Sequence, residues 1–163
     1  MALQMATNIT PDAFAGVGGA NFDASEGLNV SWQVNGSPYL LAYRITIHNI
    51  DPNSTQLYTT GKVTLPSPFY GVLSNGSVQL FNANTISASA LAAAGIVNGN
   101  EYKMYITQWW GTTDTESVTQ QSASVIRALS VPTVTIDNYP NPITQRMHTF
   151  TATYTQAQGD EIA

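Results

Sequence analysis

The 163-residue chain contains no cysteine. Disulfide bonds, a thiolate nucleophile and cysteine-based zinc sites are therefore excluded. This absence does not identify a redox compartment, because a cysteine-free protein tolerates either side of a membrane. Charged residues are also scarce: they make up 9% of the chain, against about 25% in an average domain. Thr, Ser, Asn and Gln take their place, a composition that suits a β-rich protein working outside the cytosol or in a large assembly.

Positive charge is the scarcer of the two signs. Lys and Arg total five and the net charge is −5. A nucleic-acid-binding protein normally gathers its basic residues into a patch that neutralises phosphates. The sequence therefore predicts no nucleic-acid partner, because its basic residues are scattered over Arg44, Lys62, Lys103, Arg127 and Arg146.

Long apolar runs are missing too. No stretch approaches the roughly 20 residues that span a bilayer, so we expect no membrane insertion. The opening segment "MALQMATNITPDAFAG" has neither the basic region nor the apolar core of a secretory signal. Either the chain begins after a removed signal, or the protein reaches its destination without one, as a phage virion protein released by lysis does.

What the sequence does contain is alternation of apolar and polar residues with a period of two. The segments "LNVSWQV" (28–34), "YRITIHN" (43–49) and "YKMYITQW" (102–109) each place apolar side chains on one face, as half-buried strands do. Turn residues such as "NGSP", "DPNS" and "GTTD" bound these runs. Further strands are predicted at 7–10 or 20–23, and at 56–63, 78–82 and 119–127.

Two local features qualify this pattern. Pro66 and Pro68 remove ladder donors, so their segment should be an edge or a crossing loop. One helical turn is predicted in "SALAAAGI" (89–96), capped by Ser89 and ended by Gly95. Many short strands without a long helix predict an all-β sandwich or barrel.

The composition changes near Ala128, where a proline follows and the new strands "TVTI" (133–136) and "HTFTATYTQ" (148–156) begin. In the second of these, Phe150, Ala152 and Tyr154 share one face. A segment this short does not close a sandwich of its own. We therefore expect one domain over 1–128, and a linker with the first two strands of a second, incomplete domain over 129–163. The alternative is that these strands pair with another chain by strand addition.

Two segments carry a family resemblance. "LNVSW" (28–32) resembles the second strand of a fibronectin type III domain, and "IVNGNEYKMYI" (96–106) resembles the turn and sixth strand of that family. The resemblance covers about residues 5–128. It implies that Tyr102 is a tyrosine corner, with its ring in the core and its hydroxyl bonded to nearby backbone. The expected fold class is all-β: a fibronectin type III-like or immunoglobulin-like β-sandwich, followed by the first strands of a second, incomplete one.

A narrower resemblance lies in the composition of the chain and in the succession of its strands. The cysteine-free, Thr/Asn-rich chain, in which "QSASVIRALSVPTVTI" (121–136) passes directly from one strand into another, is similar to the sandwich domains of phage and prophage structural proteins. It implies a place on a virion (tail, fibre or head surface) or on a cell surface. The implied partners are other virion or surface subunits, and a host-surface glycan.

No catalytic constellation is readable in the sequence. His48 and His148 fall in different predicted domains, on strand faces expected to be exposed, and form no triad with Ser and Asp. Asp114 and Glu116 share a loop in which solvated side chains are expected. We predict that the protein is not an enzyme and needs neither a cofactor nor a metal.

Aromatic residues supply the candidate site instead. In the strand over 102–109, Tyr105 and Trp109 should lie on the outer face, opposite the core, whereas Trp110 stands where the strand becomes a loop and can turn either way. If the strands are neighbours as in the resembling fold, Arg44 and His48 lie beside these rings. All five are candidate ligand-binding residues, for sugar rings or a partner protein; the alternative is that a loop or neighbouring domain covers the face.

The predicted function is a non-enzymatic structural or adhesive module of a phage virion, which mediates protein–protein or host-surface contacts. The alternative is a carbohydrate-binding accessory module of a secreted bacterial surface protein or enzyme.

Overall fold

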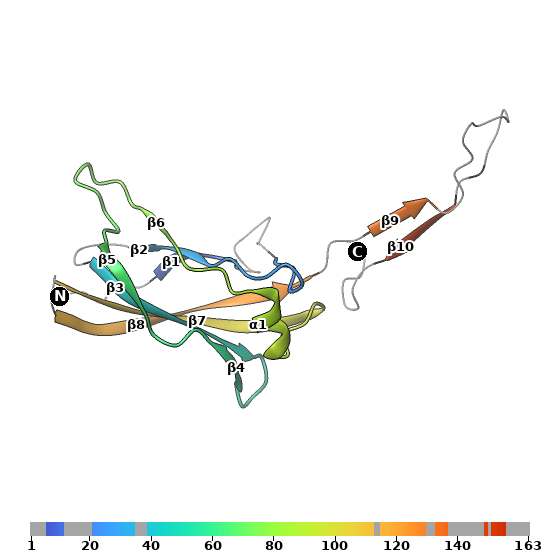
Figure 1. Cartoon of the computed structure of the whole chain (residues 1–163), viewed down its shortest axis with the longest axis horizontal. Helices are drawn as coiled ribbons and strands as arrows, with labels where there is room; N and C mark the ends of the chain where they lie inside the picture. The colour runs from blue at the N-terminus through green and yellow to red at the C-terminus, as the bar shows by residue number, and fades with distance from the viewer. Residues whose placement is uncertain are drawn as a thin grey trace.

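A computed structural model shows the chain as an assembly of antiparallel strands with one short helix (Figure 1). It describes residues 6–11, 21–34, 39–112, 115–129, 133–136, 149 and 151–155. The elements are β1 (Ala6–Thr10), β2 (Ser31–Val34), β3 (Tyr39–Asn49), β4 (Gln56–Thr59), β5 (Val63–Phe69), β6 (Leu80–Asn82), α1 (Ala88–Ala93), β7 (Asn100–Thr112), β8 (Thr115–Ala128), β9 (Thr133–Ile136) and β10 (Ala152–Thr155).

Two sheets make up the main body of the molecule. The smaller sheet has the order β1-β2-β6, and the larger has the order β4-β3-β7-β8 with β5 also pairing with β3. Every pairing between these strands is antiparallel. Figure 1 shows the two sheets as layers, with β1, β2 and β6 on one side and β3, β7 and β8 on the other. The predicted all-β sandwich class is confirmed.

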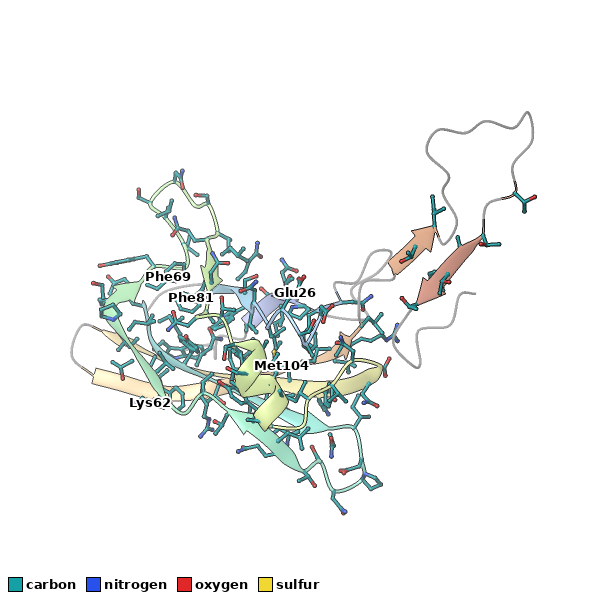
Figure 2. All side chains as sticks on the ribbon, turned by 45° about the vertical axis from the view of Figure 1, so that its right-hand side comes forward. Glu26, Lys62, Phe69, Phe81 and Met104 are labelled. Carbon is teal, nitrogen blue, oxygen red and sulfur yellow. The ribbon has the colours of Figure 1, made fainter. Side chains whose placement is uncertain are left out.

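The core lies between the two layers. The apolar faces predicted from the period of two are buried, with Trp32 contributed by β2 and Ile45 and Met104 by the larger sheet. Phe81 of β6 packs its ring 4.9 Å from that of Trp32. Phe81 and Met104, which are labelled in Figure 2, are both buried in this core. The buried apolar residues that form this core include Leu28, Val30, Trp32, Val34, Tyr43, Ile45, Ile47, Phe81, Tyr102, Met104, Ile106 and Ile126.

Tyr102 occupies the position that the resemblance implied. Its ring is buried in the core. Its hydroxyl accepts a hydrogen bond from the Val97 N–H at 2.9 Å and donates to the Val97 carbonyl at 3.2 Å. The predicted bond from this hydroxyl to nearby backbone is confirmed. It fixes the loop that enters β7.

The N-cap of the helix lies two residues before the predicted one. Ser87 is the N-cap, with an extended backbone and a side chain that accepts from the Ala90 N–H. The cap assigned to Ser89 from the sequence is therefore wrong, because Ser89 already lies inside the helix. Gly95 follows the helix with a φ of +73°, as its predicted role as the stop requires.

The strand predicted over 56–63 is in fact two strands, β4 and β5. Gly61 lies between them in the left-handed region, with a φ of +66°, and this turns the chain. β5 carries Pro66 and Pro68, and its only recorded pairing within the described residues is with β3. The predicted edge position of the proline segment is thus confirmed.

The hairpin of β7 and β8 is longer than the sequence indicated. β7 continues to Thr112 and pairs with β8 from Asn100 to Thr112. Trp110 is therefore a strand residue and not the start of a loop. It lies opposite Leu40 of β3 and is 4% exposed.

Beyond Leu129, β9 and β10 pair with each other and form a separate two-stranded sheet. Figure 1 shows this pair apart from the two larger sheets. Their apolar side chains are exposed: Val134 is 64% and Ile136 55% accessible. Both strands were predicted. Phe150, which was expected on the same face as Tyr154, lies outside the described residues.

Candidate functional site

The outer face of the larger sheet is built by β3 and β7. These strands are neighbours, and their register places His48 opposite Lys103, Thr46 opposite Tyr105, and Arg44 opposite Thr107. Side chains alternate across a strand, so these residues lie on the face opposite Ile45, Ile47 and Met104. The expectation that Arg44 and His48 stand beside the outer aromatic rings is confirmed.

One end of this face centres on Tyr105. The imidazole of His48 meets the Tyr105 ring edge to face, with the ring centroids 4.9 Å apart. The Lys103 Nζ lies 5.4 Å from the centroid of the same ring. Such cation–π contacts hold an ammonium group in place while it still faces water.

Both nitrogens of His48 are engaged. Nδ1 lies 2.7 Å from the Ser54 carbonyl oxygen, and Nε2 lies 3.3 Å from the Thr46 hydroxyl. A carbonyl oxygen only accepts, so Nδ1 donates to it and the neutral ring then accepts at Nε2. No carboxylate is among these contacts. The geometry orients the ring and provides no acid–base partner for it.

The other end of the face centres on Trp109. The Arg44 Cζ lies 5.6 Å and the Lys62 Nζ 5.0 Å from the Trp109 ring centroid. Figure 2 shows Lys62 on the opposite side of the larger sheet from Phe69 and Phe81. Ala42 lies opposite Trp109 in the sheet and is buried. The half-buried indole of Trp109, flanked by the Arg44 and Lys62 cations, therefore covers this end of the outer sheet face.

Six side chains thus form two neighbouring groups on one face of the sheet, which we together term the basic–aromatic strip. It consists of Arg44, His48, Lys62, Lys103, Tyr105 and Trp109.

Four of the five residues selected from the sequence belong to the strip, and Trp110 does not. Its ring is buried, so a ligand on the outer face would not reach it. Two residues of the strip, Lys62 and Lys103, were not selected. The alternation of side chains placed Lys103 on the outer face, so its position could be predicted from the sequence. Lys62 comes next to Trp109 only because Gly61 turns the chain between β4 and β5.

The other candidate features in the described residues offer fewer groups that could bind or react with a ligand. A shallow depression of about 440 Å³ beside α1 is lined by small and apolar side chains such as Ala88, Ala92 and Ile96, with no titratable group among them. Within the described ranges, no three His, Asp or Glu residues are grouped as a metal site. His148 and Asp114 lie outside those ranges, as does the side chain of Glu116.

In the part of the chain that the structure describes, no helix has the length and apolar character needed to cross a bilayer. No protein-family model, no curated protein and no solved structure matches the chain.

Proposed function

We propose that the chain is a fibronectin type III-like sandwich module, and that it serves a non-enzymatic structural or adhesive role on a phage virion or a cell surface. The sheet order β1-β2-β6 and β4-β3-β7-β8 supports the sandwich part of this proposal. So do the buried Trp32 on β2 and the hydroxyl of Tyr102 bonded to backbone at the entrance to β7. The cysteine-free, charge-poor composition supports the virion setting by association only.

The mechanism of such a module is geometric. A rigid sandwich holds its outer face in a fixed shape and presents it to a neighbouring subunit or a host-surface molecule. One observation carries the proposal: the basic–aromatic strip lies half-exposed on a sheet whose opposite face is packed into the core. Half-exposed aromatic and basic side chains are the types that anchor contacts between macromolecules.

The test uses gold-labelled antibodies against the chain, applied to particles from cultures that encode it and viewed by electron microscopy. We expect label on the outside of intact particles. Label confined to the soluble cell fraction would contradict the proposed location.

The presence of two aromatic side chains on one sheet face favours a second candidate, a carbohydrate-binding accessory module of a secreted protein. Tyr105 and Trp109 stand on one sheet face, and the neighbouring strand β4 presents exposed Gln56 and Thr59. Aromatic rings flanked by hydrogen-bonding side chains suit a sugar ligand. The full gene discriminates between the candidates: an accessory module should adjoin a catalytic domain, and a virion module should lie among genes for head or tail proteins.

A further inference from the structure

We propose that the basic–aromatic strip binds an anionic polysaccharide. Its acidic groups would meet the cations at the two ends of the strip, and its sugar rings would lie on the aromatic side chains. This inference rests on the proposed function, because it takes the outer face as the contact surface, and it goes further by naming the chemical class of the ligand.

Charge is the first argument. The chain has a net charge of −5, yet four of its five basic side chains lie on this one face, and one acidic partner, Glu101, is recorded for them there. Arg44, Lys62 and Lys103 contact the aromatic rings of the strip. Within the described residues, Arg44 and Lys103 form cation–π contacts and no ion pair. Arg127 is different, because the carboxylate of Glu101 neutralises it. A local positive field on an acidic protein favours an anionic partner at this face.

The Arg44 guanidinium is held ready for an anion. Its flat group lies near the Trp109 ring, and its buried Nε has no hydrogen-bond partner. The ring restricts the side chain, so less conformational freedom is lost when the remaining N–H groups bind a carboxylate or sulfate. Two parallel hydrogen bonds from a guanidinium to such a group are shorter and stronger than neutral ones.

Spacing is the second argument, and it disfavours nucleic acid. Lys103 lies opposite His48, four residues along β3 from Arg44, so the two cationic ends are separated by about 13 Å of strand. Double-stranded DNA carries one charge per about 1.7 Å of its axis. Such a dense polyanion would meet few cations here and would be repelled by the rest of the chain. A polymer with one acid per one or two sugar units matches the strip better.

The surface between the two ends favours a sugar over an acidic peptide. Thr46 and Thr107 are 6% and 7% exposed, so their side chains do not project from the sheet surface beside the Tyr105 ring. On the adjacent strand, Thr59 lies opposite Thr46 and Gln56 opposite His48, and both are exposed. A sugar offers an apolar ring face to an aromatic side chain and hydroxyls to amide and hydroxyl groups. An acidic peptide would use the cations and leave these groups to water.

The experiment is calorimetric titration of the full chain with polygalacturonate and with hyaluronan. The neutral counterparts are the same two polymers with their carboxyl groups methyl-esterified. Polyglutamate and single-stranded DNA represent the other anionic classes. Each titration is repeated at about 1 M salt, where the Debye length falls to about 3 Å and surface attraction is screened.

The variant Arg44→Gln/Lys103→Gln removes a charge from each end of the strip. The loss of charge-assisted bonds should weaken binding of an acidic polysaccharide at least about tenfold. Glu101→Gln/Arg127→Gln is the matched control, because it removes an ion pair from the same face and leaves the net charge unchanged. Lys103→Gln alone serves if the double variant unfolds at a lower temperature, because Lys103 is half-exposed and only contacts a ring.

The expected result is salt-sensitive binding of an acidic polysaccharide that Arg44→Gln/Lys103→Gln weakens and Glu101→Gln/Arg127→Gln keeps. Equal, salt-independent binding of the esterified polymers would overturn the inference and leave the proposed contact face in place. Tighter binding of polyglutamate or DNA would replace the polysaccharide with that class. Binding of none of the polymers would overturn the inference, while the antibody labelling still decides the proposed function.

Discussion

Tyr102 and Gln108 are polar residues of β7 that face the core, and each has a hydrogen-bond partner there. The Tyr102 hydroxyl is bonded to the backbone of Val97. The Gln108 Oε1 accepts from the Trp32 indole N–H at 2.9 Å, which links the two sheets. Buried polar groups are tolerated when they are paired, and these two pairs fix a loop and the distance between the layers.

Replacement of Tyr102 by Phe should lower the free energy of unfolding by about 1 kcal/mol, because both hydrogen bonds between its hydroxyl and the Val97 backbone are lost. Urea denaturation measures this change. Tyr58→Phe is the matched control, since the half-buried Tyr58 has no recorded hydroxyl bond, and its cost should stay below about 0.5 kcal/mol. Equal costs for the two variants would show that the Val97 bonds contribute nothing.

The Trp32–Gln108 bond calls for a double-mutant cycle. Gln108→Leu alone should lower the free energy of unfolding by about 1–2 kcal/mol, because it leaves the buried Trp32 indole N–H without a hydrogen-bond acceptor. In a Trp32→Phe background the same change should be nearly neutral, since it also removes the Gln108 Nε2, which is buried without a partner. Thermal unfolding of the four proteins gives the coupling energy. A cost that is the same in both backgrounds would rule out the bond as a stabilising contact.

At the scale of elements, the alternation of side chains predicted the existence of strands better than their ends. The segment 28–34 was correctly given a buried face, but only Ser31–Val34 pairs as β2. The loop assigned to 111–114 was wrong at its start, because β7 runs to Thr112. Strand ends depend on which neighbour pairs with them, and a single segment does not contain that information.

The helix α1 provides a prediction with a control two residues away. Ser87→Ala should cost about 1 kcal/mol, because the side chain that accepts from the Ala90 N–H is lost. Ser89→Ala should change stability by less than about 0.5 kcal/mol, since Ala is the better helix former and Ser89 makes only an exposed hydrogen bond to the Ser87 hydroxyl. Chemical denaturation of both variants is the measurement. A larger loss from Ser89→Ala would assign the cap to Ser89 after all.

At the scale of the whole molecule, none of the described strands of the sandwich pairs with β9 or β10. Among the residues that the structure describes before that pair, the last one with a backbone hydrogen bond to the sandwich is Leu129, whose N–H donates to the Phe22 carbonyl at 2.9 Å. The division at residues 128 and 129 therefore remains a prediction about domains, and it can be tested directly.

A chain that ends at Leu129 should unfold within about 2 °C of the full chain, because it keeps every pairing of the two larger sheets. Differential scanning calorimetry measures this. Size-exclusion chromatography with light scattering on both forms adds the oligomeric state: an oligomer of the long form alone would favour strand addition between chains over an incomplete domain. A large drop in the unfolding temperature would show that residues beyond 129 stabilise the sandwich.

The sequence by itself determined the all-β class, the inward faces of the central strands and the position of Tyr102, because each depends on a period of two or on a short local motif. It also placed Tyr105 and Trp109 on an outward face. Only the tertiary structure decided that Trp110 is buried, that Lys62 comes beside Trp109, and that Gln108 bonds to Trp32. Those outcomes follow from register and from turns such as Gly61, which bring together residues that are distant in the sequence.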